Sequence, residues 1–100
     1  MKRAVAAGHI CLDIIPAVDH PFDLIPGRLY EVGAPTIATG GAVSNTGVAL
    51  HILGIPTTLM GKVGDDSFGH SVLEVLRGYG PELAQGMVVV PGAVTSYTVV

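Results

Sequence analysis

The stretch Gly40-Gly41-Ala42-Val43-Ser44-Asn45 joins a short apolar segment at 36–39 to a longer one at 42–53 that has helical spacing. Two glycines before a helix leave backbone N–H groups uncovered at the positive end of its dipole, which suits an anion or a hydroxyl-rich ligand. The amide of Asn45, near the first turn, can donate to and accept from hydroxyl groups. A tight turn followed by a helix-start asparagine is the plainer interpretation, because glycine pairs commonly mark turns.

Strand-like and helix-like segments alternate on both sides of this stretch. Apolar strands are predicted at 3–7, 12–15, 56–63, 87–90 and 95–100, and helices at 42–53 and 67–77. In the first helix Val48, Ala49, Ile52 and Leu53 share one predicted face. Alternation of this kind indicates an α/β fold built from parallel βαβ units.

The segment from Ala17 to Pro35 is polar and rich in turn residues. Within it, 29–32 could form an exposed strand, since tyrosine and valine suit pleated surfaces. The segment is predicted to be a flap added to the main sheet. The last residues, 97–100, stop within a strand pattern, which suggests a piece of a longer protein.

Three aspartates are candidate functional residues. Asp13 follows the first strand closely, where open α/β sheets bind ligands, and its carboxylate could accept hydrogen bonds from two hydroxyl groups. A solvated loop residue or a local turn cap is the alternative. Asp65 and Asp66 are most simply helix caps, and an electrostatic role near phosphate is the weaker interpretation.

Composition excludes several classes of protein. The chain has 100 residues, a formal net charge of −3 and only 13% charged residues, and its five basic residues form no patch that would bind nucleic acid. The window 32–61 lacks charged residues, but its glycines, prolines and polar residues make it a poor membrane span. Gly8, His9 and Asp13 interrupt the apolar start too early for a signal peptide. The single cysteine, Cys11, fits a reducing compartment such as the cytoplasm.

Familiar catalytic motifs are missing from the sequence. Residues 54–63 resemble a P-loop only superficially, because six residues separate the glycines and Val63 replaces the Ser or Thr that would bind Mg²⁺. The first strand is followed by Gly8-His9-Ile10-Cys11 rather than a dinucleotide-binding fingerprint. The four histidines have no metal-ligand spacing with Cys11, so no metal site is predicted.

Four stretches together resemble the ribokinase-like (PfkB) family of carbohydrate and nucleoside kinases. They are residues 8–13, 40–49, 53–54 and the Gly-Lys-Val-Gly-Asp-Asp-Ser-Phe-Gly block at 61–69. The resemblance implies a three-layer α/β/α core with a small β-sheet lid. Residues 1–100 would form the N-terminal portion only, with lid strands within about 17–37 and 95–100.

The same resemblance implies transfer of the γ-phosphoryl group of ATP to a hydroxyl of a sugar or nucleoside. Asp13 would accept hydrogen bonds from the acceptor, Gly40 and Gly41 would offer their backbone, and Asn45 would bond a further hydroxyl. Ribokinases usually carry a lysine after the glycine pair, so Ala42 speaks against ribose. The family's catalytic aspartate and its ATP and Mg²⁺ sites lie beyond these residues, so this chain would contain no catalytic residue and would be inactive alone.

Two other functions remain open at this stage. The chain could be a non-catalytic module for assembly or small-molecule binding, because lid sheets of this family can pair between subunits and would give a homodimer through the lid. It could also be an unrelated nucleotide-binding α/β protein, but that protein would need a phosphate loop after the first strand.

Overall fold

The computed structural model describes residues 2–100 and is built around two pairs of parallel strands. β1 (Ala4–Ala7) pairs with β4 (Thr57–Met60), so that Ala4 lies opposite Thr57. β5 (Lys62–Gly64) pairs with β6 (Val88–Val90). The single strand predicted at 56–63 is thus wrong in detail, because the chain changes partner at Gly61. The parallel pairing confirms the predicted α/β architecture.

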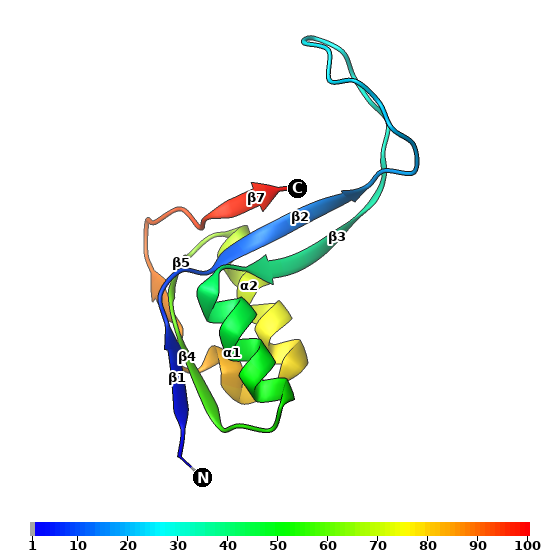
Figure 1. Cartoon of the computed structure of the whole chain (residues 1–100). Helices are drawn as coiled ribbons and strands as arrows, with labels where there is room; N and C mark the ends of the chain where they lie inside the picture. The colour runs from blue at the N-terminus through cyan, green and yellow to red at the C-terminus, as the bar shows by residue number, and fades with distance from the viewer. Residues whose placement is uncertain (1) are drawn as a thin grey trace.

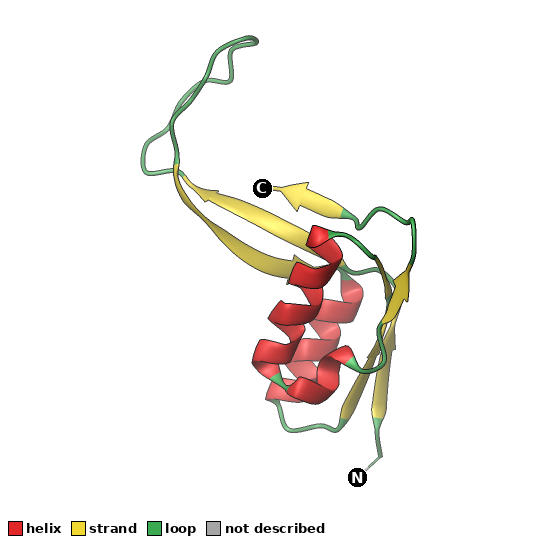
Figure 2. Cartoon of the chain, turned by 180° about the vertical axis from the view of Figure 1, so that it is seen from behind, coloured by secondary structure: helices red, strands yellow, loops and turns green. Residues whose placement is uncertain are grey.

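Two helices cover the same side of these strands, and opposite views agree on this (Figures 1 and 2). They are α1 (Ala42–Ile52) and α2 (Ser67–Tyr79), and α2 is followed by a 3₁₀ turn, η1 (Pro81–Ala84). The core between helices and strands consists of Ile10, Leu12, Val43, Val48, Leu59, Val63, Val72, Leu73, Leu76 and Leu83. The described residues therefore form a helical layer on a sheet layer.

The buried face of α1 differs from the predicted one. Val43, Ser44, Gly47 and Val48 are buried, whereas the side chain of Ile52 is 66% exposed. Leu53, just past the helix, is 75% exposed. The reason is steric: a Cβ at Gly47 would lie only 2.1 Å from Leu59 Cδ2, so the glycine side of the helix is the side that approaches β4.

A second sheet has three strands and contains the segments predicted to form a lid. β2 (Cys11–Ala17) lies between antiparallel β3 (Gly33–Gly40) and parallel β7 (Tyr97–Val99). The strand β7 falls within the predicted range 95–100. The other two strands of this sheet extend beyond the range 17–37, because β2 already begins at Cys11 and β3 runs to Gly40, next to α1. That this sheet acts as a lid stays a prediction.

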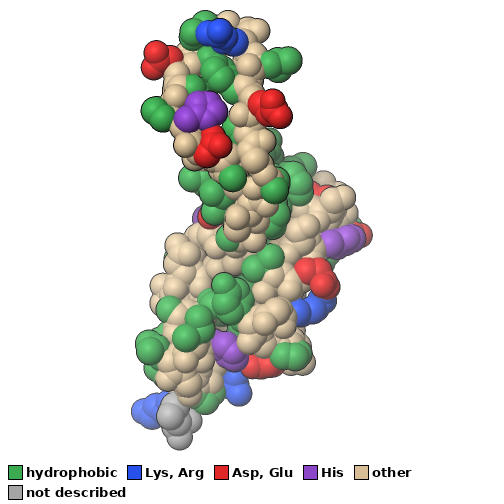
Figure 3. All heavy atoms as spheres, turned by 90° about the vertical axis from the view of Figure 1, so that its right-hand side faces the viewer, with side chains coloured by type: hydrophobic (Ala, Val, Ile, Leu, Met, Phe, Trp, Pro, Cys, Tyr) green, Lys and Arg blue, Asp and Glu red, His purple; other side chains and the backbone are tan. Residues whose placement is uncertain are grey.

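Residues 18–32 form an arm that projects from the tip of β2 and β3 (Figure 1). The strand predicted at 29–32 is wrong: these residues have no strand partner, and without cross-strand hydrogen bonds their propensity does not make a strand. Phe22 stacks on Tyr30 with 4.5 Å between ring centroids. Apolar and charged side chains alternate over the arm (Figure 3), where Leu24 is 83% and Leu29 is 98% exposed.

Candidate functional site

The carboxylate of Asp13 lies against the backbone of Gly40. Asp13 is on β2 and half-buried, and its cross-strand partner on β3 is Ala38, two residues before Gly40. A Cβ placed on Gly40 would lie 2.6 Å from Asp13 Oδ2 and 3.0 Å from Oδ1. Side chains alternate along a strand, so Asp13 points away from the face on which its neighbour Leu12 joins the core. The carboxylate can therefore lie this close to the backbone of residue 40 only because that residue has no side chain.

Gly41 forms the turn from β3 into α1. Its φ of 88° lies in the region that favours glycine, and a Cβ there would lie 2.6 Å from the carbonyl oxygen of His9. The same carbonyl accepts a hydrogen bond from Val43 N at 3.1 Å, which fixes the start of the helix against the turn after β1. Gly41 is the N-cap, and no side chain caps the positive end of α1.

Asn45 lies one turn into α1 with an exposed side chain, and its backbone N donates to Gly41 O at 2.8 Å. It borders a hollow of about 250 Å³ between β3, α1 and the end of α2. Ala38 borders the same hollow. Next to it, the hydroxyl groups of Thr39 and Ser44 are 2.6 Å apart and tie the end of β3 to α1.

The four predicted site residues thus divide into two groups. Asp13, Gly40 and Gly41 lie together at the junction of β2, β3 and α1, whereas Asn45 borders the neighbouring hollow. Ala38, which pairs with Asp13 across the strands, connects the two groups. Binding of one ligand by both Asp13 and Asn45 stays a prediction.

Cys11 adds a buried thiol beside Asp13. Its Sγ lies 3.5 Å from Asp13 Oδ1. Burial raises the pKa of the Cys11 thiol, and the hydrogen bond to the Asp13 carboxylate raises that pKa further. The thiol therefore stays protonated at neutral pH and acts as a packing group and weak donor.

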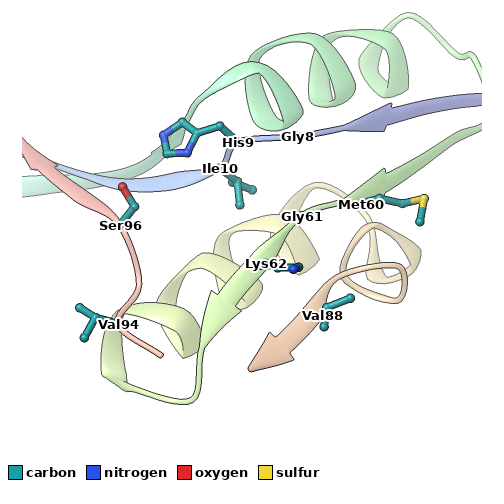
Figure 4. A pocket seen from close by; sticks show the side chains of 9 residues that line it. All are labelled: Gly8, His9, Ile10, Met60, Gly61, Lys62, Val88, Val94 and Ser96. Carbon is teal, nitrogen blue, oxygen red and sulfur yellow. The ribbon is translucent and has the colours of Figure 1, made fainter. Parts of the chain in front are cut away.

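A larger hollow, of about 460 Å³, lies where β1 and β4 end (Figure 4). The turns 8–10 and 60–62 form its floor, and Val88, Val94 and Ser96 complete its lining. His9, Lys62 and Ser96 bring polar groups to an otherwise apolar wall. This hollow could not be predicted from the sequence, because its lining comes from four separate segments and no local pattern connects them.

The two aspartates before α2 have different partners. Asp66 is the N-cap of α2 and accepts from Gly69 N at 2.8 Å, which confirms the predicted cap. Asp65 instead pairs with His70, with 2.9 Å between Oδ1 and Nε2. Among residues 2–100 no three His, Cys, Asp or Glu side chains are grouped to hold a metal ion, and no helix there is long and apolar enough to span a membrane.

Comparison with known proteins agrees with this geometry. The sequence profile described as "pfkB family carbohydrate kinase" matches residues 1–83. Fructokinase-2 of rice (Oryza sativa subsp. japonica) is 34% identical over 73 residues, which is 73% of this chain and 20% of the relative. The chain therefore spans about a fifth of that relative's length.

Two solved structures share the fold of nearly the whole chain. Fructokinase from Halothermothrix orenii is 26% identical with a TM-score of 0.70, over 98% of this chain and 33% of that protein. Fructokinase with bound ATP from Xylella fastidiosa has a TM-score of 0.72 at 22% identity, over 98% of this chain and 29% of its own.

Proposed function

Because the chain belongs to the pfkB family of carbohydrate kinases, we propose that it forms the acceptor-binding part of an enzyme that transfers the γ-phosphoryl group of ATP to a sugar hydroxyl. The observation that supports this most is the contact between the Asp13 carboxylate and Gly40, next to the open N-terminus of α1. A carboxylate accepts hydrogen bonds from hydroxyl groups, and the helix N-terminus donates them, so one polyhydroxy ligand satisfies both.

Fructose is the first acceptor to test. Fructokinase-2 of rice is 34% identical to this chain over 73 aligned residues. In addition, Ala42 stands where ribokinases usually carry a lysine. A nucleoside is the alternative acceptor within the same reaction class.

The residues of this chain do not fit ATP or Mg²⁺. No three acidic or histidine side chains among residues 2–100 are grouped to bind a cation. The turn after β1, Gly8-His9-Ile10-Cys11, has no phosphate-loop pattern. No step of the transfer is assigned to these residues, and the chain by itself is expected to consume no ATP. A cytoplasmic location belongs to the same proposal, since the one cysteine is a free thiol.

Titration of the ¹⁵N-labelled chain with fructose tests the acceptor site. Fructose is expected to shift the amide signals of Gly41 and Asn45, and Asp13→Asn should weaken the affinity by about tenfold or more, since bonds to a charged group contribute about 1.5–3 kcal/mol. Asp23→Asn, the same change on the exposed arm, is the matched control and should bind normally. Ribose and adenosine are titrated in parallel. Absence of any shift at Gly41 with all three ligands would refute the site.

A second candidate function is assembly through the lid, as a homodimer. The arm carries five exposed large apolar side chains, Val18, Leu24, Ile25, Leu29 and Val32, with Leu24 83% and Leu29 98% exposed. Exposed apolar side chains gathered on one projecting segment are typical of a surface that binds another protein. Light scattering coupled to size-exclusion chromatography gives the mass of the chain in solution directly. A dimer that Leu29→Ser converts to a monomer would support assembly, and a monomer at all concentrations would contradict it.

A further inference from the structure

Strand β7 has little to hold it in the lid. It has only three residues, Tyr97–Val99, and all of them are exposed. It lies at the edge of the sheet and pairs with β2 alone. Two flanking hydrogen bonds, Leu12 N to Ser96 O and Val100 N to Ile14 O, are each 3.0 Å long. A short exposed edge strand of this kind needs an anchor outside its own ladder.

That anchor is Thr95, which is 2% exposed. Its hydroxyl donates to Asp66 Oδ1 at 2.6 Å and accepts from Gly64 N at 2.8 Å, while its backbone N donates to Asp66 Oδ2 at 3.0 Å. The carboxylate of Asp66 thus accepts two hydrogen bonds from Thr95, in addition to the one from Gly69 N that caps α2. Thr95 and Asp66 are 29 residues apart in the sequence, so their contact joins the start of β7 to the start of α2.

The glycines of the Gly-Asp-Asp-Ser-Phe-Gly block make this contact possible. A Cβ on Gly64 would lie 2.1 Å from the carbonyl oxygen of Ala93, and a Cβ on Gly69 would lie 2.0 Å from that of Gly64. The segment before Thr95 can therefore pack this closely against residue 64 only because that residue has no side chain. Phe68 of α2 also meets Tyr97 edge to face at 5.1 Å, which ties the same two elements a second time.

The anchor determines which residue of β7 faces the acceptor site. With Thr95 fixed, Tyr97 lies opposite Leu12 and Thr98 lies opposite Asp13. We propose that Asp66 and Thr95 are positioning residues, which hold β7 in register beside Asp13 and thereby shape the acceptor site of the proposed kinase. The inference rests on the proposed function for the site itself, and the two are tested separately.

Amide hydrogen exchange of the whole chain measures how firmly Thr95 holds β7 against β2. Thr95→Val keeps the branched shape and removes the hydroxyl, so exchange at Leu12 and Val100 should accelerate by about tenfold or more, while Gly8 and Leu53 stay unchanged. Thr95→Ser keeps the hydroxyl and should restore slow exchange. Thr58→Val is the matched control on β4. Unchanged exchange at Leu12 and Val100, or equal acceleration at all four amides, would overturn the proposal.

Fructose titration of the same variants measures the consequence for the site. Thr95→Val should weaken binding by about tenfold, and Thr95→Ser should bind as the unaltered chain does. If the unaltered chain binds and Thr95→Val binds equally well, Thr95 has only a structural role and the inference fails. If the unaltered chain binds no acceptor, the proposed function fails, and the exchange data alone then decide whether Thr95 and Asp66 hold β7 in register.

A second variant covers the case in which Thr95→Val does not fold. Asp66→Asn replaces one accepting oxygen by a donating NH₂ group and leaves the threonine in place. Exchange at Leu12 and Val100 should then accelerate by about threefold or more, with Gly8 unaffected. Protection equal to that of the unaltered chain would overturn the proposal.

Discussion

Replacing Gly40 with alanine should disable the acceptor site while leaving the fold intact. Gly40 has no positive φ, and it ends β3, so the backbone accepts alanine. The new Cβ would lie 2.6 Å from Asp13 Oδ2, against about 3.4 Å for an ordinary contact, so the carboxylate must withdraw by roughly 0.8 Å. A half-buried side chain can do this by rotating away from the site.

Two effects on stability nearly cancel in this variant. Alanine restricts the unfolded chain and stabilises the fold by about 0.4–1 kcal/mol, while an off-rotamer Asp13 costs about 0.5–1.5 kcal/mol. For fructose binding, no gain offsets the loss of the Asp13 carboxylate. Hydrogen bonds from hydroxyl groups to the carboxylate contribute about 1.5–3 kcal/mol, so fructose affinity should fall by about tenfold or more.

The assay combines urea unfolding with fructose titration on two variants. Gly78→Ala is the control, because a Cβ there meets nothing within 4 Å and the residue is inside α2. It should stabilise the chain by about 0.5–1 kcal/mol without changing fructose affinity. If Gly40→Ala binds fructose as tightly as the unaltered chain does, the displaced carboxylate has no part in binding and the reasoning about Asp13 is refuted.

Three further measurements test the packing of α1 and the two ionisable groups with shifted pKa values, Asp66 and Cys11. Gly47→Ala should destabilise the chain by about 1–3 kcal/mol in urea unfolding, because the new Cβ would lie 2.1 Å from Leu59 Cδ2, and an unchanged midpoint would contradict that contact. Hydrogen bonds from the Thr95 hydroxyl, and then from the Thr95 and Gly69 N–H groups, hold the pKa of Asp66 below its usual 3.8. The ionised Asp66 carboxylate therefore stabilises the fold fully above that pH, and this stabilisation disappears as the pH falls through the lowered pKa. The stability difference between the unaltered chain and Asp66→Asn should therefore shrink below about pH 4. The raised pKa of Cys11 and its burial predict alkylation by iodoacetamide at pH 8 that is much slower than that of free cysteine, and equal rates would show that the thiol is exposed.

The elements with strong local signals could be predicted from the sequence. α2 combines an aspartate cap with an apolar stripe, and both act within a few residues of one another, so its start at Ser67 was predicted correctly. The glycine pair likewise predicted the turn into α1, and Gly41 has the positive φ that such a turn requires.

Elements that depend on a partner could not be predicted in the same way. Tyrosine and valine at 29–32 have strand propensity, but in the arm they find no neighbouring strand. The buried side of α1 depends on where Leu59 lies, and that leucine belongs to a different strand. The glycine pair, Asn45 and Asp13 were expected as site residues from their places in the sequence as well as from a family resemblance. Only the structure places Asp13 against Gly40 and leaves Asn45 beside the next hollow.

Local sequence by itself determined where the chain turns and where its helices begin, because turn residues and helix caps act over a few neighbouring residues. The tertiary structure alone decided that Thr95 meets Asp66 and that β7 faces Asp13. Contacts between residues so distant in sequence depend on packing of the whole chain, and no short pattern encodes them.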